Sequence, residues 1–444
     1  MARFTPHTEQ ETRQMLDAIG VKSIEGLFED IPANLRAKSF QIPAGMTENE
    51  TVKIFNDLSH KNRVDYISFL GGGYYDHFIP AAVNTISSRS EFYTAYTPYQ
   101  PEASQGTLRA IFEYQTMIAG ITGLEFANAS LYDGGTALYE AIAMAVRANN
   151  RRRVLIDAGV NPLFRRIVKT YLINIDIELV EVDLHDIRTD KDTLASMLDD
   201  ETAALIVQNP NFFGMVDDYE DLFSRAREKG VVSVLVFYPL SLGILKTPGE
   251  MKADIAVGEG QSLGLPLSFG GPYLGLMAVD KKFVRKMPGR IVGETVDRNG
   301  EKAFVLTLQA REQHIRREKA TSNICSNQAL CALRAVVYLS LIGKEGFRKT
   351  ALICMERAEY CKKALRAAKG VEVLSGPTFN EFTAVLPVTA EKVAKKMLSA
   401  GFAAGLPASL FYKDKSRHLI ISATEKRSES EIDHFVAAMR KALS

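Results

Sequence analysis

The sequence predicts an α/β fold: a large domain on a mostly parallel sheet, preceded by a helical arm and followed by a smaller α+β domain. Short runs that are apolar at every position alternate with amphipathic helical segments through the middle of the chain, which is typical of a parallel sheet covered on both faces. The chain has 444 residues, of which 46% are hydrophobic, so it can bury more than one core.

Composition narrows the classes of partner. Lysine plus arginine (54) nearly balance aspartate plus glutamate (53), so nothing favours nucleic acid or an anionic membrane, and we expect small molecules and proteins. The N-terminus has no basic region followed by an apolar one, and the apolar stretch 329–343 is interrupted by Arg334, which predicts a soluble cytoplasmic protein. Four cysteines match no metal or redox spacing and are expected as reduced core residues: Cys325, Cys331, Cys354 and Cys361.

Residues 1–60 are predicted to form the helical arm. Thr8 with Glu11, and Thr47 with Glu50, have the spacing of a capping box, and each pair precedes apolar residues at helical spacing. Two short helices cannot bury their apolar stripes alone. We therefore expect the arm to pack on the body of the chain or on another subunit.

The large domain is predicted over residues 61–325 and begins with an irregular aromatic region. G-G-G-Y-Y at 71–75 is followed, from Glu91 to Gly106, by prolines and tyrosines with almost no periodicity. Tyrosine offers a flat apolar face and a hydroxyl, which suits pockets and interfaces. The density of tyrosines favours a site or subunit contact over an ordered surface loop. The candidate pocket-wall residues are Tyr93, Tyr96, Thr97, Tyr99 and Gln100.

A second candidate lies at the start of the helical run 137–147, which Gly134, Gly135 and Thr136 precede. Backbone amides at a helix start bind anions, so a phosphate could bind there. N-capping by Asp133 or Thr136 would explain the same residues equally well.

The alternating part of the chain predicts the parallel sheet. Helices are expected at 163–171 and 217–229. Ligands in such folds bind outside the carboxyl ends of the strands, and the polar segments 208–214 and 238–241 lie at such ends. The expected strands are 154–156, 177–182, 203–207, 231–237, 255–257 and 274–279.

The glycine-rich segment 254–272 follows one of these strands and is the strongest site candidate. Large pyridoxal-phosphate (PLP) enzymes hold their cofactor through a lysine amine. This segment contains Gln261 and Ser262 but no lysine. The strand 231–237 also lacks, at its end, the carboxylate that would pair with a pyridine nitrogen, since Tyr238 and Pro239 follow it.

The remainder of the chain carries weaker signals. The mixed charges of 311–319 predict a solvated helix that includes Arg316 and Arg317, and Thr321 to Asn323 predict a turn with possible access to the site. The small domain, 326–444, is expected to contribute no chemical groups. Its expected helices are 328–342, 349–368, 390–400 and one after the capping box Ser428 to Glu431, with strands at 371–374, 382–386 and 419–421.

Five strings together resemble the glycine cleavage system P-protein family, glycine decarboxylase, and the resemblance covers nearly the whole chain. In family members split into two chains, it is subunit 1, the N-terminal half of the single-chain form, that this sequence resembles. One departure is Tyr238, where the family pattern has an aspartate before the proline. The matching strings occupy residues 96–106, 208–214, 258–264, 269–272 and 311–325.

The resemblance implies a type I PLP-enzyme fold, with a seven-stranded type of sheet. It also implies that the Schiff-base lysine belongs to a second chain, subunit 2, in an α2β2 heterotetramer with PLP near the contact between unlike subunits. Glycine would lose CO2, and the aminomethyl group would pass to the lipoyl arm of H-protein. This chain would then supply no catalytic residue, with Gln261 and Ser262 in the former cofactor loop and the tyrosine-rich loop as one wall of the pocket.

Two other hypotheses remain open. One is a self-sufficient homodimeric PLP enzyme, such as an aminotransferase, anchored by Lys246 or Lys252, although Lys246 precedes a turn and is more typical of a solvated loop. The other is a non-catalytic scaffold that only stabilises a partner.

Overall fold

The computed structural model describes residues 6–39, 41–320, 322–324 and 326–444. The chain divides into two compact units, residues 1–64 and 65–444. In the first unit, α1 (Glu9–Ile19) and α2 (Glu48–Ser59) both begin with the predicted capping boxes, at Thr8 and Thr47. Neither helix buries a residue, so the apolar stripe of each is exposed. Within the described residues, no helix has the length and apolar character needed to span a bilayer.

A seven-stranded sheet is the centre of the second unit and confirms the predicted α/β class. Its order is β2-β8-β7-β6-β5-β3-β4, and the pairs between β4, β3, β5, β6 and β7 are parallel, whereas β8 pairs antiparallel with both β7 and β2. The strands are β2 (Phe126–Ala127), β3 (Arg153–Asp157), β4 (Glu178–Val182), β5 (Thr202–Asn209), β6 (Val232–Phe237), β7 (Ile255–Glu259) and β8 (Gly275–Val279).

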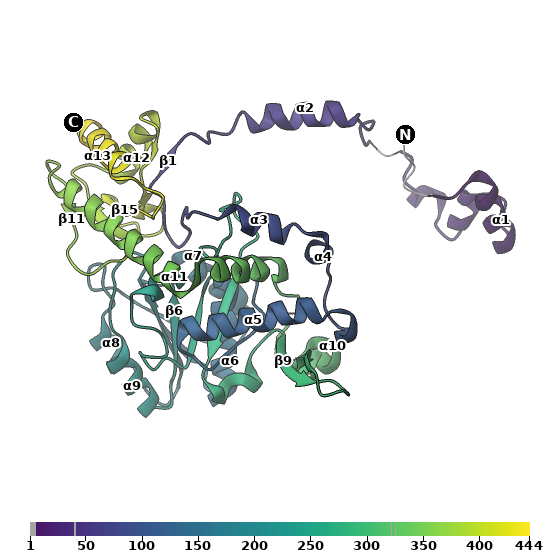
Figure 1. Ribbon diagram of the computed structural model, residues 1–444, viewed down its shortest axis with the longest axis horizontal. Coiled ribbons are helices and arrows are strands. Elements are labelled where there is room, and N and C mark those ends of the chain that lie inside the picture. The colour runs from purple at the N-terminus through teal and green to yellow at the C-terminus, as the bar shows by residue number, and fades with distance from the viewer. Residues whose placement is uncertain (1–5, 40, 321, 325) are drawn as a thin grey trace. The chain divides into compact units, whose positions relative to one another are not determined.

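Alternate side chains of each strand enter different cores. On β6, Val234 and Val236 pack in the core that includes α6 (Gly134–Asn149) and α7 (Pro162–Leu172), whereas Leu235 packs with α9 (Glu220–Glu228) and Phe237 packs with α5 (Gln105–Thr122). Burial on both faces explains why the strands read as continuous apolar runs. Helices α5 and α11 (Ala329–Arg366) run side by side (Figure 1). The shorter helices are α3 (Ala81–Ser87), α4 (Ser90–Tyr93) and α8 (Lys191–Ser196).

A β-hairpin was missed by the sequence analysis. Strands β9 (Ile291–Val296) and β10 (Lys302–Thr307) pair antiparallel and close the hairpin around Asn299 and Gly300. After it, the predicted solvated helix over 311–319 is only a short α10 (Gln313–Arg316) followed by one turn of 3-10 helix. In the turn predicted over 321–323, Thr321 lies outside the described residues, as does Cys325.

The C-terminal part contains a four-stranded sheet, in the order β11-β12-β15-β14. The two helices predicted at 328–342 and 349–368 are both present within α11, on either side of Gly343, whose backbone angles are not helical. Strand β1 (Ile67–Ser68) pairs with β13 (Phe402–Ala403), so the first residues after the arm join this part. The remaining elements are β11 (Glu372–Val373), β12 (Glu381–Val385), β14 (Leu406–Pro407), β15 (His418–Ser422), α12 (Ala390–Ser399) and α13 (Glu429–Leu443).

Candidate functional site

The loop after β7 is packed into the protein. Gln261 and Ser262 are both buried. The side-chain amide of Gln261 accepts a hydrogen bond from Tyr75 N at 3.0 Å and donates to Tyr75 O at 3.1 Å and Leu265 O at 2.8 Å. A glutamine can both accept and donate, as this pairing requires, whereas a lysine ammonium can only donate. Gln261 therefore fixes the G-G-G-Y-Y segment against the loop after β7.

The backbone N–H of Gly134, at the start of α6, already has a hydrogen-bond acceptor within this chain. Glu259, at the end of β7, accepts from Gly134 N at 3.0 Å, and also from Gln261 N and Leu274 N at 3.1 Å each. Burial raises the pKa of the Glu259 carboxyl from 4.5 to about 8, although these three N–H groups favour its charged form. A carboxyl group of this chain thus lies where the predicted anion would bind.

The rest of that helix start is also filled. Asp133 caps the helix by accepting from Thr136 N at 2.8 Å, which is the N-cap arrangement weighed above. Gly134, Gly135 and Thr136 are buried, and a Cβ on Gly134 would lie 2.6 Å from the ring of Phe164 on α7. Anion binding by these three residues stays a prediction, and this packing opposes it.

The end of β6 carries a buried hydrogen-bond chain. The Tyr238 hydroxyl contacts Nε2 of His77, and Nδ1 of His77 lies 2.7 Å from Oε2 of Glu425. Although burial alone would raise it, the hydrogen bond and charge of His77 lower the pKa of Glu425 to about 2. Burial raises the pKa of the Cys354 thiol, which lies 3.2 Å from the same carboxylate oxygen. His77 and Glu425 were not candidates because they lie far apart in the sequence.

A hollow of about 340 Å³ opens beside Gln261, and its lining includes a lysine. Lys426 is on its lining, but its Nζ lies 2.7 Å from Oδ1 of Asp76. The Nζ of Lys426 is thus engaged by a carboxylate of the same chain. The other lining residues include Tyr75, His77, Phe78 and Leu267.

The two lysines of the homodimer hypothesis precede β7 and so lie on the side of its amino end. Lys246 pairs with Glu220 at 2.6 Å and with Asp218 at 2.9 Å, and Lys252 pairs with Glu220 at 2.8 Å. Hydrogen bonds to Glu220 and Asp218 raise the pKa of Lys246. A nucleophilic lysine needs the opposite shift.

These observations decide whether the chain fits a PLP cofactor. The loop after β7 has no lysine amine, the residue that follows β6 is Tyr238 and not an acid, and the backbone N–H of Gly134 donates to Glu259. None of the three contacts that the cofactor would need is present in this part of the described chain. The residues therefore do not fit PLP.

The aromatic loop is the most exposed part of the candidate site. The exposed fractions of Tyr93, Tyr96 and Tyr99 are 67%, 83% and 45%. Gln100 is exposed and Thr97 is partly buried. Beside the loop, Tyr93 and Tyr96 line an apolar cleft with residues of α5 and α11. Exposed aromatic side chains next to an apolar cleft are typical of a contact surface.

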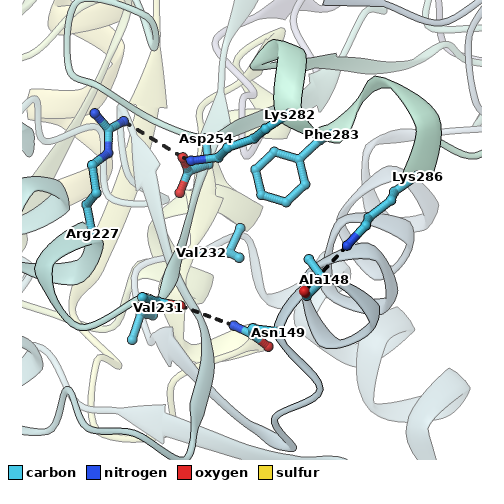
Figure 2. A pocket seen from close by; sticks show the side chains of 10 residues that line it. Ala148, Asn149, Arg227, Val231, Val232, Asp254, Lys282, Phe283 and Lys286 are labelled. Carbon is cyan, nitrogen blue, oxygen red and sulfur yellow. Dashed lines mark hydrogen bonds and ion pairs between the residues drawn. The ribbon is translucent and has the colours of Figure 1, made fainter.

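A second hollow, of about 300 Å³, lies at the amino ends of β6 and β7 (Figure 2). The buried carboxylate of Asp254 lies there, accepts from Ser233 N at 3.0 Å and pairs with Lys282, while Arg227 lies 3.8 Å away. The charge of Asp254 is therefore paired with cations of the same chain. The hollow also lies at the amino ends of the strands, whereas ligands in such folds bind at the carboxyl ends.

Comparison with known proteins places the chain. The glycine cleavage system P-protein family matches residues 2–439. The probable glycine dehydrogenase (decarboxylating) subunit 1 of Citrifermentans bemidjiense is 53% identical over 441 residues, 99% of each chain. The protein of the same description from Maridesulfovibrio salexigens is 51% identical over 438 residues, 98% of this chain and 99% of the relative.

Solved structures agree. A crystal structure of glycine decarboxylase (P-protein) of the glycine cleavage system, in inhibitor-bound form, has 42% identity and a TM-score of 0.93, and each chain covers 100% of the other. A sphingosine-1-phosphate lyase from Burkholderia pseudomallei has 16% identity and a TM-score of 0.68 over 93% of each chain, which shows the fold alone. The predicted type I fold of PLP-dependent enzymes is confirmed. The chain belongs to the glycine cleavage system P-protein family.

Proposed function

We propose that this chain is subunit 1 of a glycine decarboxylase, the P-protein of the glycine cleavage system, and that it lacks the lysine that binds PLP. The assembled enzyme removes the carboxylate of glycine as CO2 and transfers the aminomethyl group to the lipoyl arm of H-protein. The names of the relatives, glycine dehydrogenase (decarboxylating) subunit 1, support the activity and imply a second subunit. The proposed assembly is a cytoplasmic α2β2 heterotetramer in which subunit 2 binds PLP.

One observation supports placing the cofactor on subunit 2 and not on this chain. The places where a cofactor would be anchored are occupied by side chains of this chain: Gln261 in the loop after β7, Glu259 at the amide of Gly134, and Tyr238 bonded to His77. Removing these side chains from their partners would leave buried polar groups unpaired. The buried network therefore supports a cofactor on the other subunit, which supplies the electron sink for decarboxylation.

The chain's own role in the reaction is then to shape the pocket. The aromatic loop, with Tyr93, Tyr96, Thr97, Tyr99 and Gln100, is our candidate for the wall that faces subunit 2. The exposure of its tyrosines supports this, because an unpartnered aromatic surface gains most from being covered. A wall of this kind excludes water and orients glycine, while the reacting atoms are held by the partner.

An absorbance titration tests the proposal. The purified full chain, mixed with PLP, is expected to give the spectrum of free aldehyde, and a co-expressed second subunit should restore both the Schiff-base band and glycine-dependent CO2 exchange. A Schiff-base band from this chain alone would support the homodimer hypothesis. Lys426→Met is the informative control, because any band that it removes comes from the lysine that lines the hollow beside Gln261.

The scaffold hypothesis needs a separate experiment. In the reconstituted enzyme, Tyr96→Ala and Tyr99→Ala should lower CO2 exchange by about tenfold or more, since loss of a positioning contact commonly has this effect. Tyr171→Ala is the matched control: it is 43% exposed, close to the 45% of Tyr99, but lies on α7. Full turnover of both loop variants, with intact assembly, would favour a scaffold.

A further inference from the structure

Arg290 is a buried cation without a counter-ion. The residue is only 4% exposed and lies just before β9. Its Nε has no hydrogen-bond partner, Nη2 lies 3.3 Å from the Tyr99 hydroxyl, and Nη1 lies 3.5 Å from Oδ1 of Asn327. Within the described residues, no carboxylate forms an ion pair with this guanidinium. Both of its contacts are long and neutral, which is a poor environment for a desolvated charge.

The surroundings of Arg290 add positive charge. Arg311 donates hydrogen bonds to the carbonyl oxygens of Met287, Gly289 and Leu308, and the charge of the neighbouring Glu312 also acts on its guanidinium. The neighbouring acid, Glu312, is turned to His314, with 3.6 Å between Oε2 and Nδ1. Because Arg311 bonds the carbonyl oxygen of Gly289, the residue before Arg290, two guanidinium groups lie in the same part of the fold and favour a bound anion.

The free edge of Arg290 has the geometry of an oxyanion receptor. The Nε–H and the adjacent Nη2–H of a guanidinium point the same way and match two oxygens of a carboxylate or phosphate. Among the described residues, Nε of Arg290 has no hydrogen-bond partner and Nη2 contacts the Tyr99 hydroxyl, and the centre of the Tyr99 ring lies 5.3 Å from the guanidinium carbon. Tyr99 belongs to the exposed aromatic loop, so the hydroxyl can give way to a stronger acceptor.

We propose that Arg290 is an oxyanion-binding residue that receives a carboxylate or phosphate monoester on its Nε–Nη2 edge, with the Tyr99 hydroxyl as placeholder. The site is separate from the helix start at Gly134, where Glu259 already accepts. Only the identity of the bound anion rests on the proposed function. In the assembled enzyme the two candidate anions are the phosphate of the cofactor bound by subunit 2 and the carboxylate of glycine. Binding itself is a property of this chain.

Line broadening of small ions by the full chain tests the proposal without the second subunit. Inorganic phosphate is observed by 31P NMR and acetate by 13C NMR, at constant ionic strength maintained with NaCl. We expect the wild type to broaden at least one ion saturably. Arg290→Met should abolish the effect, and Arg290→Lys, which keeps the charge but loses the fork, should weaken affinity about tenfold. The ion that binds more tightly identifies the source.

Two further variants make the result decisive. Arg165→Met is the control for removal of a largely buried arginine, because Arg165 is already paired with Glu181 at 2.9 Å, and it should bind like wild type. Tyr99→Phe should bind at least as tightly as wild type, since the competing hydroxyl is gone. The proposal is wrong if neither ion is broadened, if Arg290→Met or the folded Arg290→Lys binds like wild type, or if Tyr99→Phe binds more weakly.

Discussion

Glu381 is expected to make the stability of this chain fall as the pH rises. The residue begins β12 and is buried; its Oε1 accepts from Gly72 N at 2.6 Å and its Oε2 from the Tyr75 hydroxyl at 2.9 Å. It therefore fixes the segment that Gln261 holds from the other side. The isosteric change Glu381→Gln keeps an acceptor for Gly72 and removes the titrating group.

The magnitude follows from the pKa. Burial raises the pKa of Glu381 from 4.5 to about 7, so the folded chain binds a proton that the unfolded chain releases above about pH 4.5. Below about pH 4.5 the Glu381 carboxyl is protonated in both states, and the folded chain has its full stability. As the pH rises from there through about 7, the unfolded chain releases the proton more readily than the folded chain, so the free energy of unfolding falls. At about 1.4 kcal/mol per pKa unit, wild type loses about 3 kcal/mol relative to Glu381→Gln across this window.

Urea unfolding at pH 5, 6, 7 and 8 measures this difference. The free energy of unfolding of Glu381→Gln minus that of wild type should rise by about 3 kcal/mol between pH 5 and 8, with unchanged m-values. Other buried acids titrate in both proteins and cancel in the difference. The control, Glu294→Gln on β9, alters an exposed acid paired with Lys302 and should give a flat difference. Parallel profiles for Glu381→Gln and wild type would refute the reasoning.

Two further predictions concern packing around the candidate site and the helix α5. Glu259→Ala leaves three N–H groups without their acceptor and should lower the free energy of unfolding by about 3 kcal/mol or more, measured in urea at pH 7; an unchanged midpoint would contradict the network. Gly249→Ala places a Cβ 2.1 Å from the carbonyl oxygen of Gly123 and should lower the thermal midpoint by several degrees, whereas Gly120→Ala, with no atom within 4 Å of the new Cβ, should raise it slightly. Equal midpoints for these two glycine variants would count against the packing described.

Local patterns predicted most of the elements. The capping boxes at Thr8, Thr47 and Ser428 each begin a helix, because this signal depends on residues three apart. The hairpin β9–β10 was missed although Asn299 and Gly300 form a typical turn pair between alternating strands. The break between the two helices predicted at 328–342 and 349–368 is present at Gly343, because a glycine at positive φ (58°) interrupts the helix.

The candidate site was predictable only in part. The missing amine is visible in the loop of Gln261 and Ser262, because it depends on residue type alone. The contact of Glu259 with Gly134 joins residues 125 apart, and the contact of His77 with Glu425 joins residues 348 apart, so neither has a local signature. Arg290 also drew no attention in the sequence, since a lone arginine is usually solvated and only its burial distinguishes it.

The central claim is that the amine which anchors PLP belongs to another chain. The most direct test is borohydride reduction of the reconstituted enzyme, followed by mass mapping of the pyridoxyl group on both subunits. The account predicts a pyridoxyl-lysine on the second subunit and an unmodified lysine at each of Lys246, Lys252 and Lys426. A stoichiometric pyridoxyl group on any lysine of this chain would contradict it.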